Sequence, residues 1–309
     1  MTAPLQSVLH PAGPDAAVMA DMAWVLFAGG ALIFAAVMAL LVLSLRGAGK
    51  PVRPMRWIAG AGIAFPVVVL TALLAWSTWH SGKLSAQNSL QPLRISVIAK
   101  MWWWEVRYHD PATGRDIIGA NEIHIPAGRS AYVGISTADV LHSLWIPALN
   151  GKMDAIPGRM TGLTLHAAQP GVYRGQCAEY CGEQHARMAL HVVAHTPRAF
   201  DAWLAAQARP AAAPASALAE RGRAAFLAQR CATCHTVRGV GNGLALGPDL
   251  THVGSRMYIA AGTLRNHRAT LAGWIADPQA AKPGARMPAA GDIDSATVFA
   301  MAAWLEGLK

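Results

Sequence analysis

Charged residues are scarce in this sequence of 309 residues: Asp, Glu, Lys and Arg make up 14% of it, against roughly 25% in an ordinary soluble domain. Hydrophobic residues make up 53%, and the mean hydropathy is +0.28. Such a chain is too apolar to be disordered and too poor in charge for an ordinary soluble enzyme. Its length allows two or three domains at roughly 100–200 residues each.

Several signatures of common functions are also missing. The net charge is +9, but no run of Lys and Arg with interleaved aromatic residues appears, so nucleic-acid binding is not indicated. The sequence has no pattern of a Ser/His/Asp triad, no P-loop and no dinucleotide-binding fingerprint. What it does have is two long hydrophobic runs and four cysteines.

The two hydrophobic runs, 23–45 and 57–79, contain no charged residue. Each exceeds the roughly 20 residues that a helix needs to cross a bilayer. The alternative is a pair of buried core helices, but soluble helices of that length usually carry charge on one face. The segment before residue 23 has no Lys or Arg, whereas the loop between the runs has no acid and four basic residues, Arg46, Lys50, Arg53 and Arg56. The positive-inside rule therefore predicts a cytoplasmic loop, with both flanks on the periplasmic or outer side.

Beyond the hydrophobic runs the pattern changes twice. Between residues 92 and 195, short apolar runs alternate with Gly, Pro and Asn-rich turns, which predicts a β-sandwich or barrel of about 100 residues. An Ala/Pro-rich stretch follows and predicts a semi-stiff linker. The remainder is helical in pattern, with helices expected at about 217–230, 270–276 and 294–307. The predicted organisation is an outer N-terminal segment 1–22, a hairpin 23–82, a β domain 83–195, a linker 196–216 and a helical domain 217–309.

The first cysteine pair lies in Cys231-Ala-Thr-Cys234-His235, which is the signature of a covalently attached c-type haem. Two thiols at this spacing can each take one vinyl group, and the adjacent histidine is placed to coordinate iron. A thioredoxin-like redox pair is the alternative, but no βαβ pattern surrounds these cysteines. We therefore predict haem attachment at Cys231 and Cys234 with His235 as an axial ligand.

The iron of such a haem needs a second axial ligand, and a methionine there raises the reduction potential. Met287 is the first choice, because it lies in a rigid loop, Lys282-Pro-Gly-Ala-Arg-Met287-Pro, just before the last predicted helix. Met257 is the next candidate. Met301 falls on the apolar face of the last predicted helix and is expected in the core.

The second cysteine pair lies in a loop that supplies two thiols, an imidazole and a thioether: Cys177, Cys181, His185 and Met188. Such soft ligands select copper or zinc over hard cations. His142, upstream, could complete the set across the sandwich. Two bridging thiolates, one imidazole per copper and weak axial groups would make a mixed-valence copper pair. A structural zinc site and a disulfide between the two cysteines remain alternatives.

At this point the chain resembles subunit II of the haem–copper cytochrome c oxidases, in the caa3 variant with a fused cytochrome c domain. The resemblance runs from about residue 17 to the end. It rests on the helix pair and on four motifs in order: Trp102-Trp-Trp, Asp139-Val-Leu-His-Ser, Asp154-Ala-Ile-Pro-Gly-Arg and the Cys-x-Glu-x-Cys-x₃-His-x₂-Met loop. It implies a multidomain membrane protein with a two-helix transmembrane hairpin, a cupredoxin-like β-sandwich or barrel and an all-α class I cytochrome c domain.

The resemblance also implies a role for each residue of the metal loop. Cys177 and Cys181 would bridge the two coppers of a CuA centre, with terminal imidazoles and axial groups from His142, His185, Met188 and the Glu179 carbonyl. The Glu179 side chain resembles the ligand of a magnesium ion at the interface with subunit I. Trp102 aligns with the tryptophan through which the family receives electrons. Neither helix carries an acid near the family's proton-channel glutamate, so no proton-uptake role is assigned.

The function that the resemblance implies is that of the subunit through which electrons enter an aerobic terminal oxidase of the bacterial inner membrane. Electrons would pass from a donor, such as a cytochrome c or an upstream quinol-oxidising complex, through haem c and CuA to the haem and CuB of subunit I. Oxygen would be reduced to water there, with proton pumping by the complex. Subunit III and membrane lipid are further expected partners. The chain would be an oxidoreductase and translocase only as a subunit, since it shows no oxygen-reducing site of its own. Two alternatives are the CuA subunit of a nitric oxide reductase and a membrane-anchored copper-binding or chaperone module.

Overall fold

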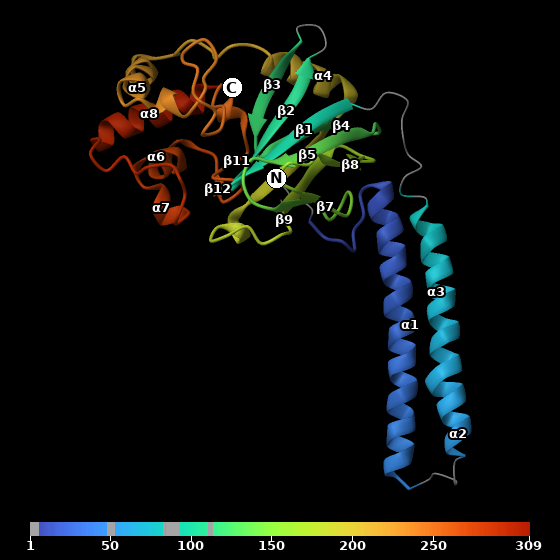
Figure 1. Cartoon of the computed structure of the whole chain (residues 1–309). Helices are drawn as coiled ribbons and strands as arrows, with labels where there is room; N and C mark the ends of the chain where they lie inside the picture. Colours follow the sequence, from blue (N-terminus) through green and yellow to red (C-terminus); the bar gives the residue numbers. More distant parts are fainter. Residues whose placement is uncertain (1–5, 48–52, 83, 85–92, 111–113) are drawn as a thin grey trace.

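The computed structural model has three parts: a pair of long helices, a β-sandwich from which they project, and a helical domain packed against the sandwich (Figure 1). The structure describes residues 6–47, 53–82, 84, 93–110 and 114–309. Lys50 of the predicted cytoplasmic loop and the predicted domain boundary at residue 83 lie outside the described residues.

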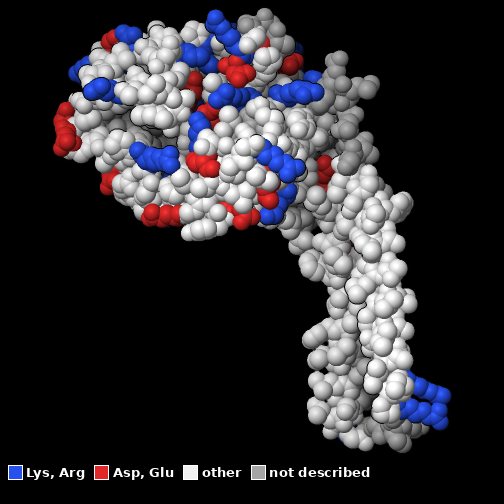
Figure 2. All heavy atoms as spheres, viewed as in Figure 1, with Lys and Arg blue, Asp and Glu red and all other residues white. Residues whose placement is uncertain are grey.

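The two long helices lie side by side and are exposed along most of their length (Figure 1). Helix α1 spans Pro14–Leu45; α2 (Pro54–Trp57) continues through the π-helical turn η1 (Ile58–Ala64) into α3 (Phe65–Ser81). Their most apolar windows have mean hydropathies of 2.7 and 2.3, and none of either window is buried. Both helices are long and apolar enough to cross a membrane. Basic side chains gather at the end farthest from the sandwich (Figure 2).

Helix α1 begins at Pro14, well before the predicted start at residue 23, because its first turns pack on the sandwich. The Ala12 N–H donates to the Ala148 carbonyl at 2.7 Å. Asp15 is 7% exposed and accepts a hydrogen bond from the Asn150 amide at 3.0 Å. Proline at the first helical position, with its fixed φ and no N–H, suits a helix start. The membrane helix is therefore continuous with a segment docked on the β domain.

The sandwich consists of two five-stranded sheets. The first has the order β3-β2-β1-β5-β8 and the second β4-β10-β9-β6-β7. The strands are β1 (Leu93–Lys100), β2 (Trp103–Asp110), β3 (Arg115–Ala120), β4 (Glu122–Pro126), β5 (Ala131–Thr137), β6 (His142–Trp145), β7 (Lys152–Ala155), β8 (Thr161–Leu165), β9 (Gly171–Cys177) and β10 (Ala189–His195).

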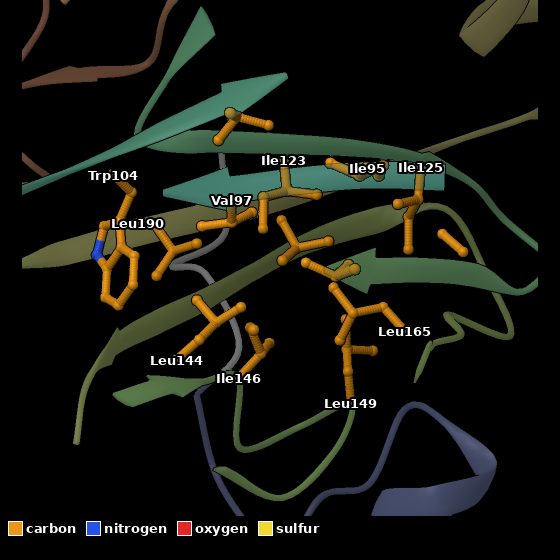
Figure 3. Packing of buried hydrophobic residues seen from close by; sticks show 14 of the residues in the cluster. Ile95, Val97, Trp104, Ile123, Ile125, Leu144, Ile146, Leu149, Leu165 and Leu190 are labelled. Carbon is orange, nitrogen blue, oxygen red and sulfur yellow. The ribbon is translucent and has the colours of Figure 1, made fainter. Parts of the chain in front are cut away.

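The core lies between the two sheets, and Figure 3 shows side chains of both sheets meeting there. Along β1 every second residue is buried, which is the alternation expected of a strand with one face in the core. Val97 and Trp104 from the first sheet face Ile123 and Leu190 from the second, and all four are fully buried. This packing holds the ends of β6, β9 and β10, where the metal loop is attached.

The linker predicted over residues 196–216 is partly wrong, because its first half is helix α4 (Pro197–Gln207). Phe200 is 3% exposed and belongs to the sandwich core, and the Trp203 ring stacks on that of His124 with centroids 3.9 Å apart. With Leu204 these residues form an i, i+3, i+4 apolar face, a helical signal inside an Ala-rich stretch. Only residues 208–216 connect the domains without regular structure.

The helical domain comprises α5 (Ala217–Ala228), η3 (Cys231–Thr233), η4 (Val253–Ser255), β11 (Tyr258–Ile259), β12 (Leu264–Arg265), α6 (Arg268–Ala276), α7 (Pro278–Ala281) and α8 (Ser295–Gly307). Its core is centred on Phe226 and Trp304, whose rings meet edge to face at 5.1 Å. Gly222 allows α5 and α8 to cross closely, since a Cβ there would lie 2.0 Å from the Ala300 carbonyl oxygen. Met301 is 1% exposed in this core, where the sequence predicted it.

Candidate metal centres

The soft ligands of the second cysteine pair come together at one end of the sandwich. Cys177 ends β9 and His142 begins β6; these strands pair through Leu144 and Cys177. The loop then turns through Cys181 and the short helix η2 (His185–Arg187) to Met188, directly before β10. The Cys177 N–H donates to the Met188 carbonyl at 2.9 Å and closes the loop at its base.

The distances place two thiols between two imidazoles. The Sγ atoms of Cys177 and Cys181 are 3.8 Å apart. His142 Nδ1 lies 3.9 Å from Cys177 Sγ, and His185 Nδ1 lies 3.7 Å from Cys181 Sγ. Two further groups flank the thiols: Met188 Sδ, 3.9 Å from Cys181 Sγ, and the Glu179 carbonyl, 3.1 Å from Cys177 Sγ. All six predicted ligands therefore converge on one place.

The two thiols of this cluster are free and buried. A hydrogen bond from the Cys181 thiol, aided by one from His142, lowers the pKa of Cys177. The neighbouring Cys177 in turn raises the pKa of Cys181, so without a cation only one of the two thiols ionises readily. A soft, positively charged metal would allow both to bind as thiolates. The donor set thus fits copper, and the thiols do not form a disulfide.

Asp139 orients the first imidazole, a role that the sequence pattern did not reveal. Its Oδ1 lies 2.8 Å from His142 Nε2, which leaves Nδ1 directed at Cys177. Its Oδ2 accepts a hydrogen bond from the Met101 N–H at 2.7 Å. Although burial alone would raise the pKa of Asp139, hydrogen bonds led by that from His142 lower it. A carboxylate on the far nitrogen is the usual means of fixing the tautomer of a metal-binding histidine.

Trp102 lies between β1 and β2 and is half-buried. Its indole N–H donates to the Cys181 carbonyl at 2.8 Å, which joins the ring directly to the backbone of the cysteine loop. Of its neighbours in the tryptophan run, Trp104 is fully buried and belongs to the core. Its ring nevertheless meets that of His142 edge to face with centroids 6.2 Å apart, so Trp102 contacts the candidate metal site from a half-buried position and Trp104 from the core.

The Glu179 carboxylate lies 3.6 Å from the Lys152 ammonium. Lys152 also lies 3.7 Å from Asp154, and these three side chains are at least a third exposed. One carboxylate next to a lysine is not by itself a magnesium site, since that ion takes six oxygen ligands including waters. Next to Glu179 the described residues bring one further carboxylate, that of Asp154, to the same Lys152 ammonium.

The predicted haem attachment site forms a short turn after α5. Cys231 begins η3, and its carbonyl accepts the N–H groups of Cys234 and His235 at 3.2 and 3.1 Å, so the two thiols and the imidazole are held in one turn. His235 Nδ1 lies 2.8 Å from the Pro248 carbonyl oxygen. Because a carbonyl can only accept, Nδ1 carries the proton and Nε2 is free for iron. Burial lowers the pKa of His235, which favours the neutral imidazole that a metal requires.

The absence of a side chain at Gly247 leaves room for the His235 imidazole. A Cβ at Gly247 would lie 2.5 Å from Cε1 and 2.8 Å from Nδ1 of His235. The neighbouring Pro248 supplies the carbonyl acceptor. The segment Gly247-Pro-Asp-Leu250 therefore contacts the predicted axial histidine and fixes its orientation.

The candidate sixth ligands are placed differently. Met287 is half-buried and packs, as Cys231 and Leu250 do, against the core of the helical domain. The backbone N–H of Met257 instead donates to the Glu122 carboxylate of the sandwich at 2.7 Å. Met287 and Cys231 of the attachment turn thus pack on the same core, and the choice of Met287 over Met257 as the sixth ligand stays a prediction.

The fold and its sites define a class: a membrane-anchored cupredoxin-like domain with a two-thiol copper loop, fused to a cytochrome c domain. Two family models match the chain, one described as cytochrome c oxidase subunit II, periplasmic domain, over residues 110–195, and one described as cytochrome c over residues 219–309. The chain belongs to the cytochrome c oxidase subunit 2 family and carries a fused C-terminal cytochrome c domain, as in the caa3 type.

Two relatives support this assignment. Cytochrome c oxidase subunit 2 of Alkalihalophilus pseudofirmus is 35% identical over 248 residues, covering 78% of this chain and 70% of that protein. The protein of the same name from Bacillus sp. strain PS3 is 31% identical over 259 residues, covering 80% and 70%. The crystal structure of the periplasmic domain of the Bradyrhizobium japonicum subunit II matches with a TM-score of 0.35 at 30% identity, covering 38% of this chain and 93% of that one. The chain is thus a subunit of an oxidoreductase complex, and its two domains imply copper and haem c.

Proposed function

We propose that this chain is the subunit through which electrons enter an aerobic terminal oxidase, with a donor feeding the cytochrome c domain. When bound, a haem c and a copper pair would exchange single electrons in this chain, and subunit I would reduce oxygen to water while the complex pumps protons. The donor would be a soluble or membrane cytochrome c or an upstream quinol-oxidising complex. Subunits I and III and membrane lipid would surround the two helices.

The observation that carries this proposal is that Trp102 contacts both the cysteine loop and the loop that leads to Met287. On one side its indole N–H reaches the Cys181 carbonyl. On the other, the loop that leads to Met287 packs beside its ring, since a Cβ on Gly284 would lie 3.7 Å from Trp102 Cη2. We therefore assign Trp102 as the side chain next to which electrons pass from the cytochrome c domain to the copper domain.

For the copper site we propose a dinuclear CuA centre rather than a zinc site. Cys177 and Cys181 would bridge the two metals, with His142 and His185 as the terminal ligands. Met188, which lies next to the Cys181 thiol, and the Glu179 carbonyl, which lies next to the Cys177 thiol, would be the axial groups. Zinc has no need of the thioether, whereas a soft sulfur suits copper. Cys231, Cys234, His235 and Met287 would hold the haem.

For magnesium we propose that the Glu179 side chain supplies one ligand at the interface with subunit I, and that subunit I supplies the others. This requires Glu179 to exchange its contact with Lys152 for the metal when the subunits assemble. A divalent cation would make that exchange favourable, because it binds a carboxylate more strongly than an exposed ammonium does.

For the membrane orientation we propose that the N-terminus and both folded domains face the periplasm and that the loop between the helices faces the cytoplasm. The basic side chains at the far end of the helix pair are those that the positive-inside rule retains on the cytoplasmic side (Figure 2).

The first test is spectroscopic, on the full-length chain purified with its partner subunits. We expect one covalent haem and two coppers per chain, with a mixed-valence copper spectrum that includes a near-infrared band. A labile, single copper without that band would favour the chaperone alternative, and a colourless site would favour zinc. Turnover of nitric oxide but not of oxygen would favour the reductase alternative.

The second test uses graded substitutions. Cys177→Ser removes a bridging sulfur, and since a hydroxyl bridges soft copper poorly, the dinuclear spectrum should disappear. Met188→Leu removes only a weak axial group and should shift the potential while both coppers remain. Met153→Leu, a methionine that packs on the same core, is the matched control and should change neither property. An unaltered copper spectrum in Cys177→Ser would refute the bridging role.

A further inference from the structure

The cytochrome c domain and the copper domain are joined by a polar interface that the sequence did not predict. The Ala189 N–H donates to the Ala261 carbonyl at 3.0 Å, next to the hairpin of β11 and β12. The Met257 N–H donates to the Glu122 carboxylate at 2.7 Å. The ring of His191 also stacks on that of Tyr258 at 4.5 Å. The two domains therefore touch over main chain as well as side chains.

One residue of this interface stands apart, because it is a lysine that is only 4% exposed: Lys282, just after α7. Its ammonium donates to the carbonyl of Trp102 at 2.6 Å and to that of Arg187 at 2.9 Å, both in the copper domain. Among the described residues it makes no ion pair with a carboxylate. A buried ammonium is costly unless hydrogen-bonded, and these acceptors belong to the other domain. A third and longer contact, 3.5 Å to the Ala260 carbonyl, lies within its own domain, so the two short hydrogen bonds of this side chain both cross the interface and would have to be replaced by water if the domains separated.

Lys282 lies close in sequence to one predicted metal ligand and bonds to a residue next to another. Its acceptor Arg187 precedes the proposed ligand Met188, and its own chain continues to Met287. The contact is reciprocal, since the Arg187 guanidinium donates to the Ala281 carbonyl at 2.8 Å.

Close packing of the same loop adds to this restraint. Gly284 has a φ of +77°, and a Cβ there would lie 2.6 Å from the Glu183 carboxylate, so the loop backbone itself rests on the copper loop. The lysine and the glycine together leave the 282–284 segment little freedom relative to Trp102.

We propose that Lys282 is a positioning residue that docks the cytochrome c domain on the copper domain, with its ammonium held by the Trp102 and Arg187 carbonyls. The docked state is then the resting state of the chain, and internal electron transfer takes place within it rather than after a diffusive encounter of tethered domains. The kinetic part of this inference rests on the proposed function; the docking part does not.

The test of docking compares Lys282→Met with the unaltered chain in the assembled complex. Methionine keeps a long unbranched side chain but removes the ammonium. Hydrogen exchange at the amides of Ala189 and Met257, whose acceptors lie across the interface, should become about tenfold faster, because a charge-assisted docking bond is lost. Lys309→Met removes one positive charge from an exposed position of the same domain and should leave both amides as protected as before. Unchanged protection of both amides in Lys282→Met overturns the proposal.

The kinetic test follows the reduction of haem and copper separately after mixing with a fast reductant. Lys282→Met should reduce its haem at the parental rate but pass electrons to copper about tenfold more slowly, in proportion to the lost docked population. The haem and copper spectra should be unaltered, which a general loss of folding would not permit. A parental internal rate alongside faster amide exchange would overturn the kinetic part.

A measurement on the unaltered chain keeps the proposal falsifiable if the variant does not fold. Pulsed dipolar spectroscopy between the oxidised haem and copper centres should give one narrow distance at both low and high salt. A broad distribution would refute a docked resting state. Absence of either metal signal would instead refute the proposed function.

Discussion

Replacing Gly247 by alanine tests the proposed axial histidine without touching a ligand. The new methyl group would stand 2.5 Å from Cε1, 2.8 Å from Nδ1 and 3.0 Å from Nε2 of His235. Carbon atoms in contact normally keep about 3.5–4.0 Å, so the imidazole or the loop must move by roughly 1 Å. A displacement of that size breaks the 2.8 Å hydrogen bond from Nδ1 to the Pro248 carbonyl.

The energetic cost can be estimated from these two effects. Overpacking costs about 1–3 kcal/mol and the lost hydrogen bond about 1 kcal/mol, so the cytochrome c domain should lose about 2–4 kcal/mol of unfolding free energy. Covalent attachment should survive, because Cys231 and Cys234 are not altered. The bond from His235 to iron should weaken, and part of the ferric haem should become high-spin.

The assay is a chemical denaturation followed at the haem, together with the ferric absorption spectrum and the potential. Gly273→Ala is the matched control, since no atom lies within 4 Å of a Cβ at that position in α6. There the alanine should raise stability by about 0.5–1 kcal/mol, because alanine is the better helix former. A Gly247→Ala protein with a parental spin state and parental stability would show that the imidazole does not occupy the place assigned to it.

Three further predictions concern other parts of the chain. Met287→Ala should keep its haem but lose the sulfur-to-iron charge-transfer band at the red end of the oxidised spectrum, and its potential should fall; survival of that band here and its loss in Met257→Ala would reverse the ligand assignment. Trp102→Ala should slow internal transfer from haem to copper while both metal spectra stay intact, and an unchanged rate in stopped-flow reduction would leave Trp102 with a packing role only. Burial lowers the pKa of His191 to about 4, so between about pH 6.5 and 4 the unfolded chain binds more protons and the folded chain loses stability as the pH falls. His191→Phe, which keeps a ring to stack on Tyr258, should remove roughly 1–3 kcal/mol of that acid sensitivity in thermal unfolding at pH 5 against pH 7, and identical losses in both proteins would contradict this.

The parts of the fold that the sequence predicted are those with a long or repeated signal. The helix pair follows from two uncharged runs, and the sandwich from short apolar runs separated by Gly, Pro and Asn-rich turns. Strands β6 and β7 have four residues each and carry little alternation, and α4 was hidden in an Ala-rich stretch because its apolar face has only three large residues. Short elements depend on what they pack against, which the local sequence does not contain.

The candidate sites divide in the same way. A metal site is indicated by sequence spacing alone where four soft ligands lie in one loop: Cys177, Cys181, His185 and Met188. Asp139 and Pro248 act through a carboxylate and a carbonyl on residues that no spacing rule marks, and they were identified only from the contacts of His142 and His235. The docking role of Lys282 depends on acceptors 180 and 95 residues away in the chain, at Trp102 and Arg187. Such pairings arise from the tertiary fold and have no local signature.

Helix α1 is continuous from its first turns on the sandwich to its apolar, exposed part, and this continuity has a mechanical consequence. Because Ala12 and Asp15 are bonded to the β domain and the helix continues to Leu45, the helix and the domain turn as one body. A transmembrane helix adapts to a bilayer of different thickness by changing its tilt. A thicker or thinner bilayer would therefore rotate the β domain together with the helix and displace the copper loop relative to the membrane surface. Because the helix is long, a small change in tilt gives a large displacement. The lipid composition of the bilayer would thus adjust the orientation of the β domain relative to the neighbouring subunit.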